Sequence, residues 1–402
     1  MQPLAVLSAA LLLGAALAPT AAHAQAATES SAATTNAAAS DDEATAKAEA
    51  ARAELYDLPE GATEQVAMEK LSKIQRAPAA ANTREAVRAN LTDMLAFTDK
   101  VLARDYSASA LQNTAALKYS LYNALKQLGQ DDALDERSKW LSTLTASDDK
   151  TRQSIGRTLL ALEPVAALAF ESKVDEARWK NAVQPSIDLV NGIATEGREP
   201  SQFELEAVMA ISEMLDGTAP VSVSAPAFEA YAAAFGKSDN ATLQMVSEMF
   251  AGTARRLTLP GSKMKIQGDT LDGREFQLQR DLAGKVVLVD FWATWCGYCI
   301  EAFPEMKRVY EQYQDQGFEI VGVNLDDSRD VVDAYLKSDP LPWTNIQVLE
   351  GDGSEHPNAK RYAVSGIPFL VLVGRDGKVI RTQVAPQQIE TLVKDALAAK
   401  AE

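Results

Sequence analysis

The chain has 402 residues, of which 47% are hydrophobic and 24% charged, and its formal net charge is −17. This length predicts about two or three domains at roughly 100–200 residues each, and the apolar content is ample for their cores. Because the negative charge repels phosphate backbones and anionic lipid headgroups, nucleic acids and anionic membrane surfaces are excluded as partners.

Residues 1–24 contain a continuous apolar run that ends in the A-x-A pattern of Ala22, His23 and Ala24. Such a run is too short to span a bilayer comfortably and is typical of a cleaved secretory signal peptide. We therefore expect a periplasmic protein with no membrane insertion after signal removal. A retained anchor helix and a buried apolar helix are the alternatives. Residues 25–53, rich in Ala, Ser and Thr, predict a flexible low-complexity linker.

Residues 54–256 show helical spacing of apolar residues nearly throughout, which predicts an α-helical domain. One segment opens with Ser201 and Glu204 in capping-box spacing, a signature of a helix N-terminus. No fixed repeat period recurs, so a compact bundle is favoured over irregular helical repeats. Another segment places four apolar residues near one helix face: Val87, Leu91, Leu95 and Val101.

No catalytic motif occurs in this helical region. We expect its large aromatic and methionine side chains to fill the core, with partner binding as the alternative. The residues in question are Trp140, Trp179, Met245 and Phe250.

Residues 260–402 alternate strand patterns with helix patterns, which predicts a mixed-sheet α/β domain. Asp-Gly pairs mark hairpin turns, and a β-branched run predicts a buried parallel strand. The expected elements are a hairpin turning at Asp272-Gly273, a buried strand at 285–291, a helix from about Cys296 to Gln316, a strand at 319–325, a short helix near 329–336, a strand near 345–349, a hairpin turning at Asp376-Gly377 and a last helix near 388–399.

Cys296 and Cys299 are the two cysteines of the chain. A bridge between them closes a loop too short to stabilise the fold much, so redox chemistry explains the pair better. Two intervening residues at a helix N-terminus let one sulfur face solvent while the other lies beneath it. Free amides and the helix dipole favour the thiolate of Cys296 and lower its pKa. Cys296 is therefore the expected nucleophile, and Cys299 the resolving cysteine.

The stretch KVVLVDFWATWCGYC, followed further along by SGIPFLVLVGRDGKVI, resembles the thioredoxin fold and most specifically its exported TlpA/ResA-like branch. The resemblance covers roughly residues 260–400. It implies a thiol-disulfide oxidoreductase that acts on protein thiols and disulfides and needs no cofactor. Many such relatives carry a Glu three residues after the second cysteine. This chain has Ala302 there, with Glu301 expected to point elsewhere, so a second active-site acid is in doubt.

Asp290 stands at the end of the apolar strand, where an ionised carboxylate is costly. Its pKa should be raised, and it could accept the proton of Cys299. The family has this role at the matching position. A solvent-facing carboxylate is the alternative.

The resemblance also implies a cis peptide at Ile367–Pro368 that packs across from the cysteines. The backbone of Ile367 would then pair with an extended substrate segment. Phe369 stands where relatives often have Thr, and Trp292 is expected to pack so as to shield the disulfide. The residues expected to bind substrate are Trp295, Gly297, Tyr298, Ile367 and Pro368.

Other uses of the cysteines lack the residues they require. Haem attachment needs a His after the second Cys, and this position is Ile300. A structural zinc needs four ligands, whereas the mature chain offers two Cys and only His356 as imidazole. We therefore expect no metal site.

The primary hypothesis is an exported oxidoreductase whose helical domain selects protein partners or mediates homo-oligomerisation. A reductant would need electrons from a membrane donor protein, whereas an oxidant would not. The second hypothesis is a disulfide isomerase that dimerises through its helical region, because Gly297-Tyr298 also occurs in periplasmic isomerases. The third is a helical envelope scaffold with a redox-reporting thioredoxin-like appendage.

Overall fold

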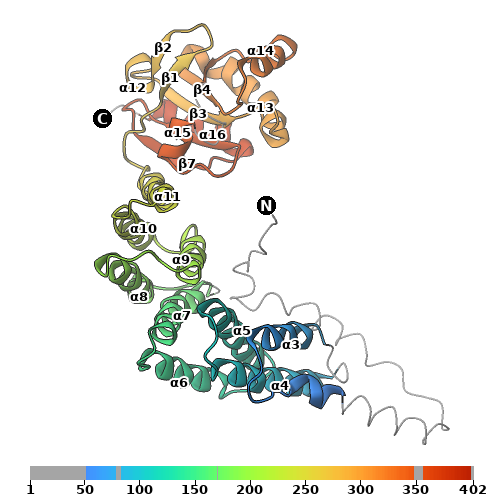
Figure 1. The fold of residues 1–402 in the computed structure, drawn as a ribbon. Helices are drawn as coiled ribbons and strands as arrows, with labels where there is room; N and C mark the ends of the chain where they lie inside the picture. The colour runs from blue at the N-terminus through green and yellow to red at the C-terminus, as the bar shows by residue number, and fades with distance from the viewer. Residues whose placement is uncertain (1–50, 78–82, 170, 348–355, 400–402) are drawn as a thin grey trace, which may run out of the picture. The chain divides into compact units, whose positions relative to one another are not determined.

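The structure, a computed structural model, describes residues 51–77, 83–169, 171–347 and 356–399 (Figure 1). The expected signal peptide and the expected linker up to residue 50 lie outside the described residues. Within the described part, residues 51–56 are helical.

Backbone contacts divide the described chain into two compact units. The first contains the residues up to 189 together with 200–218, and the second contains 190–199 together with the residues from 219 onward. The last two helices of the helical region therefore belong to the same unit as the C-terminal sheet. The expected domain limits, 54–256 and 260–402, stay a prediction about which segments fold independently.

Helices make up most of the described residues between 51 and 257, as the periodicity predicts. Helices that follow one another in the chain pack together, notably α4 on α5, α6 on α7 and α10 on α11. Their bounds are α3 Glu64–Arg76, α4 Arg84–Leu102, α5 Ala108–Gln127, α6 Ala133–Thr145, α7 Lys150–Leu168, α8 Glu176–Thr195, α9 Gln202–Leu215, α10 Val221–Phe235 and α11 Ala241–Leu257.

The expected helix start at residue 201 is confirmed. The Ser201 hydroxyl accepts a hydrogen bond from the Glu204 backbone N–H, and the Glu204 carboxylate accepts one from the Ser201 N–H. The expected apolar face of α4 is confirmed too. Leu91 and Val101 are buried, and partly buried Val87 and Leu95 pack against the same cluster.

The expected core side chains of the helical region are confirmed in part. Trp179 and Phe250 are buried, and Trp140 is half-buried against the core of the first unit. The expectation is wrong for Met245, which is 56% exposed. Because an α-helix turns about 100° per residue, Met245 lies some 200° around α11 from the buried Leu243 and faces away from the core.

The C-terminal part of the second unit is a seven-stranded mixed sheet in the order β2-β1-β5-β4-β3-β6-β7. The central pairs β3–β4 and β4–β5 are parallel, and the other neighbours are antiparallel. Both expected hairpins are present. The elements are β1 Gln267–Thr270, β2 Glu275–Gln277, α12 Leu278–Asp281, β3 Val286–Trp292, α13 Gly297–Tyr313, β4 Phe318–Asn324, α14 Arg329–Ser338, β5 Thr344–Gln347, α15 Pro357–Arg361, β6 Phe369–Val373, β7 Val379–Thr382 and α16 Ile389–Ala398.

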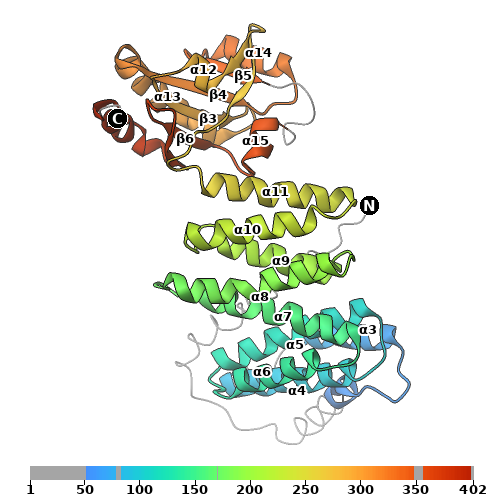
Figure 2. The same cartoon turned by 90° about the vertical axis from the view of Figure 1, so that its left-hand side faces the viewer.

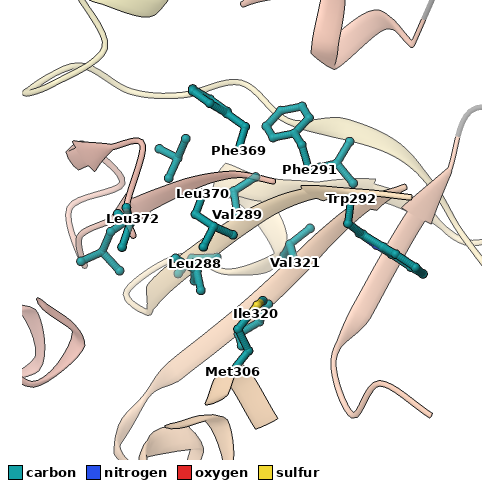
Figure 3. Close-up of a cluster of buried hydrophobic side chains, with 14 of the residues drawn as sticks. Leu288, Val289, Phe291, Trp292, Met306, Ile320, Val321, Phe369, Leu370 and Leu372 are labelled. Carbon is teal, nitrogen blue, oxygen red and sulfur yellow. The ribbon is translucent and has the colours of Figure 1, made fainter. Parts of the chain in front are cut away.

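Strand β3 is buried along its whole length because it has a neighbour on each side and packed side chains on both faces. Figure 3 shows Phe291 and Phe369 on one side of the sheet, with Leu288, Trp292 and Met306 on the other. Met306 belongs to α13, so this second side is the one that α13 covers. This alternation follows from the two-residue period of a strand.

Gly322 of β4 pairs in register with Asp290 of β3 and with Asn345 of β5. A side chain at Gly322 would meet Asn345 Oδ1 at 2.0 Å and Trp292 Nε1 at 2.8 Å. The Asn345 side chain therefore lies over Gly322 and accepts a hydrogen bond of 3.0 Å from the Trp292 indole. The missing side chain of Gly322 makes room for this contact beside Asp290.

Within the described ranges, none of the helices combines the length and the apolar composition needed to cross a bilayer.

We expect Gly322→Ala to lower the free energy of unfolding by about 3 kcal/mol, because the new methyl group displaces Asn345 and leaves the Trp292 indole without an acceptor. Urea denaturation of the oxidised chain measures this change. The control is Gly192→Ala in α8, where an added Cβ meets nothing within 4 Å. A Gly322→Ala protein as stable as the control would contradict the described packing of Asn345 over Gly322.

Candidate active site

Cys296 and Cys299 form a disulfide with an S–S distance of 2.04 Å and a Cα–Cα distance of 5.3 Å. Cys296 is the N-cap of α13, and its Sγ accepts a hydrogen bond of 3.2 Å from the Cys299 backbone N–H. The exposed fraction is 6% for Cys296 and 1% for Cys299. Cys296 is thus the more accessible of the two residues, in the order expected from sequence, although both cysteines are largely covered.

The helix N-terminus places the Cys299 backbone N–H against the outer sulfur. The first turn of an α-helix leaves its N–H groups without helical partners, and the helix dipole adds partial positive charge there. The N–H of Cys299 already points at Cys296 Sγ in the disulfide form. This arrangement stabilises negative charge on Cys296 once the bond is reduced.

Two exposed aromatic side chains flank the disulfide. Trp295, just before Cys296, is 69% exposed, and Tyr298, between the cysteines, is 77% exposed. Gly297 is exposed as well. Two large exposed aromatic rings beside one disulfide form an apolar rim, and this rim is the best candidate for a contact surface around the disulfide.

The Ile367–Pro368 peptide is cis, as the resemblance implies, and both residues are half-buried. Phe291 of β3 pairs in antiparallel register with Phe369 of β6. The end of β3, which leads to Cys296, and the start of β6, which follows Pro368, therefore lie at the same end of the sheet.

Asp290 is buried in the middle of the sheet and is 1% exposed. The alternative of a solvent-facing carboxylate is therefore wrong. Its Oδ2 atom has no hydrogen-bond partner among the described residues. Desolvation by burial raises the pKa of Asp290 from 3.8 to about 8. The carboxyl group is thus protonated over much of the neutral range.

Strand alternation places Asp290 on the same face of β3 as Trp292. The Trp292 ring packs edge-on against Phe303 of α13, with centroids 5.3 Å apart. Cys299 and Phe303 are four residues apart and share one face of α13. The buried acid and the inner cysteine therefore belong to the same sheet–helix interface.

Trp292 is fully buried and acts as a packing residue, in contact with Phe303 and with Tyr335 of α14. Its expected shielding of the disulfide stays a prediction. Phe369 also packs in the core, edge-on to Phe291 at 5.8 Å between centroids. Ala302, which stands where relatives often carry Glu, is buried, and Glu301 is exposed.

Asp326 is a site residue that the sequence reasoning missed. Its carboxylate accepts hydrogen bonds from the Thr294 N–H at 2.9 Å, the Thr294 hydroxyl at 2.6 Å and the Asn324 amide at 2.7 Å. Only 5% of Asp326 is exposed. These bonds fix the turn between β3 and Cys296. The signal in the sequence is the pair Asp326-Asp327, which directly follows the expected apolar strand at 319–325.

His356, the imidazole considered for a metal, lies at the start of α15 and is 2% exposed. Its Nδ1 accepts a hydrogen bond from the Asn358 N–H, and burial lowers its pKa to about 4. Among the residues that the structure describes, no three His, Cys, Asp or Glu side chains gather so as to hold a metal ion.

Comparisons with known proteins find relatives of the C-terminal part of the chain. Residues 284–379 match a family model described as "Thioredoxin-like". The chain is 33% identical over 129 residues to "Thiol-disulfide oxidoreductase ResA" of Bacillus subtilis, an alignment covering 31% of this chain and 65% of that protein. It is also 33% identical over 122 residues to the protein of the same name in Bacillus thuringiensis subsp. konkukian, covering 30% of this chain and 67% of that protein.

A solved thioredoxin domain of a thiol-disulfide oxidoreductase from Bacteroides vulgatus is similar at 27% identity and a TM-score of 0.32, covering 34% of this chain and 96% of that chain. From the sequence relatives, the chain belongs to the ResA-like thiol-disulfide oxidoreductases through its thioredoxin-like C-terminal domain. The helical region lies outside the aligned part, since the alignments cover only about a third of the chain.

We expect the stability of the oxidised protein to depend on Asp290 in a pH-dependent way. Its native pKa lies above its unfolded value, so the native state holds a proton that the unfolded state releases between pH 3.8 and about 8. The free energy of unfolding therefore falls across this window as pH rises. Asp290→Asn removes this penalty and should stabilise the protein by on the order of 5 kcal/mol at pH 8 and little at pH 4.

Urea denaturation of both proteins from pH 4 to pH 8.5 measures this difference. Asp281→Asn, at an acid whose pKa is lowered instead, is the control and should show no gain at pH 8. A constant difference between the wild type and Asp290→Asn across the range would contradict a protonated Asp290.

Proposed function

We propose that this ResA-like chain is an exported thiol-disulfide oxidoreductase that exchanges disulfides with protein substrates through Cys296 and Cys299. The observation that carries the proposal is the disulfide at the N-terminus of α13, flanked by exposed Trp295 and Tyr298. A pair that stabilises the fold little, placed where a thiolate is favoured and next to exposed aromatic rings, suits exchange with another protein.

In the reducing direction, the thiolate of Cys296 attacks one sulfur of a substrate disulfide. A mixed disulfide forms, and the first substrate sulfur leaves as a thiolate that takes a proton from water. Deprotonated Cys299 then attacks Cys296 Sγ, which closes the Cys296–Cys299 bond and releases the second substrate thiolate. Two electrons pass from the cysteine pair to the substrate, and the reverse sequence oxidises a substrate dithiol.

Asp290 supplies the proton-transfer step that Cys299 requires. A buried thiol has a raised pKa and reacts only after it loses its proton. Asp290 is buried, lies in the same sheet–helix interface and has a pKa of about 8, so the fraction that is ionised near neutral pH can accept a proton from Cys299. An acid with an ordinary pKa would be a weaker base for this purpose.

Protein substrates can be held by backbone pairing at the cis-proline loop. The backbone of half-buried Ile367, just before Pro368, would hydrogen-bond an extended segment that carries the substrate cysteine. The exposed Trp295 and Tyr298 rings would contact side chains on either side of that cysteine. The space in front of Gly297 is open, because a Cβ added there meets nothing within 4 Å, so the substrate can approach Cys296 from this side.

The export part of the proposal rests on the apolar run and A-x-A pattern of residues 1–24. In an oxidising compartment, a reductant of this kind would receive its electrons from a membrane donor protein. The helical region would select the protein partners or join copies of the chain. The same exchange chemistry also serves an oxidant or an isomerase.

We expect Cys299→Ala to accumulate mixed disulfides with periplasmic proteins, because Cys296 can still capture a substrate sulfur while nothing displaces it. The adducts should appear as high-mass bands on non-reducing gels and collapse on addition of dithiothreitol. The control is the double variant Cys296→Ser with Cys299→Ala, which has no nucleophile. Equal band patterns for the single and double variants would contradict the proposal.

A further inference from the structure

One face of α11 lies directly against α15, as Figure 2 shows. Glu248, Gly252 and Arg255 occupy this face, because steps of four and three residues return to the same side of a helix. All three contact residues at the end of α15 or just after it. These contacts join the last helix of the helical region to the thioredoxin-like part of the same compact unit.

Gly252 sets how closely the two helices approach. A Cβ atom at this position would lie 2.9 Å from the backbone nitrogen of Ala363 and 2.9 Å from the carbonyl oxygen of Lys360. Both neighbours are backbone atoms, which cannot rotate away as a flexible side chain can. Gly252 is buried, so only glycine fits in this arrangement. A glycine inside a helix lowers the stability of the helix. The close approach of α15 explains why glycine is nevertheless present at this position.

Two polar contacts flank Gly252. The Arg255 Nε donates a hydrogen bond of 2.8 Å to the carbonyl oxygen of Arg361, the last residue of α15. The Glu248 carboxylate lies 3.3 Å from the Lys360 ammonium group. The last carbonyls of a helix have no partner within it, so Arg255 satisfies a group that α15 leaves open.

The opposite side of the same segment is tied to the sheet. The Tyr362 hydroxyl accepts a hydrogen bond of 2.8 Å from the Lys265 backbone N–H, and the Asn358 side-chain amide donates one of 2.7 Å to the Gln267 carbonyl. Residues 357–363 are thus held between α11 on one side and the chain at the start of β1 on the other.

This segment leads directly into the cis-proline loop. Ala363 has a φ of 46°, in the left-handed region that residues other than glycine rarely adopt. The Ala363 N–H donates a hydrogen bond of 3.1 Å to the Lys360 carbonyl, and a Cβ at position 252 would strike both atoms of this bond. Only Val364, Ser365 and Gly366 separate Ala363 from the cis Ile367–Pro368 peptide. A displacement at Ala363 therefore reaches the loop through a short stretch of chain.

We infer that α11 is a brace for the cis-proline loop, and that Gly252 and Arg255 are positioning residues for the docking of protein substrates. The inference rests on the proposed exchange function. The brace acts on the loop through α15, whereas the cysteines belong to α13 and the turn after β3. Loss of the brace should impair reactions that need the loop and spare those that need only Cys296.

The test compares the full-length chain with Gly252→Val in three measurements. These are dithiothreitol-driven reduction of insulin, the equilibrium of the cysteine pair with glutathione, and the rate at which iodoacetamide alkylates reduced Cys296. We expect KM for insulin to rise at least fivefold, while the glutathione equilibrium constant and the alkylation rate stay within twofold of the wild type. Gly192→Val in α8, where a Cβ meets nothing within 4 Å, is the matched control and should leave all three unchanged.

An unchanged KM in a folded Gly252→Val protein would overturn the inference. So would a rise in KM accompanied by a more than twofold change in both the glutathione equilibrium constant and the alkylation rate, because this would indicate general loss of structure. Should Gly252→Val fail to fold, Arg255→Ala decides the question. This variant removes the hydrogen bond to the Arg361 carbonyl without adding a Cβ between the helices. We expect KM to rise about threefold, whereas no rise overturns the brace. A wild type unable to reduce insulin would contradict the proposed function, and the inference with it. An active wild type with unchanged variants would contradict the brace alone.

Discussion

The structure depends on one junction, where the buried strand β3 ends and α13 begins at Cys296. The strand fixes the direction of the chain, and the first turn of the helix then points the Cys299 N–H at the outer sulfur. Burial of β3 between two strands makes the junction rigid, because its backbone is paired on both sides. The disulfide, the aromatic rim and the buried acid all take their positions from this junction.

Two aspartates next to the junction show how environment assigns roles to identical side chains. Asp290 leaves one carboxyl oxygen without a partner in an apolar interface, so the neutral form is favoured and the group can exchange a proton near neutral pH. Asp326 instead accepts hydrogen bonds from Thr294 and Asn324, and these bonds hold the turn before Cys296. The first aspartate suits proton transfer, and the second suits fixing the backbone. Gly322 has no side chain, and this leaves the space in which Asn345 reaches the Trp292 indole beside Asp290.

The features that sequence could predict are those set by neighbours in the chain. The Asp-Gly turns, the capping box at Ser201 and the apolar run of β3 each specify local structure, and all are present. The burial of Asp290 followed from its place in that run. Asp326 and Gly252 could not be found in this way, because their partners come from distant segments that only the fold brings together. Met245 was misjudged because residue type alone does not tell which side of a helix faces the core. The role of the cis-proline loop came from the family resemblance rather than from the pattern of residues.

The central claim is that reduced Cys296 is held as a reactive thiolate at the start of α13. The most direct measurement is the rate of iodoacetamide alkylation of the reduced Cys299→Ala protein from pH 4 to pH 10, in which Cys296 is the only thiol. The account predicts a rate that follows a single ionisation with an apparent pKa at least one unit below the value of about 8.5 for free cysteine. An apparent pKa of about 8.5 or higher would contradict it.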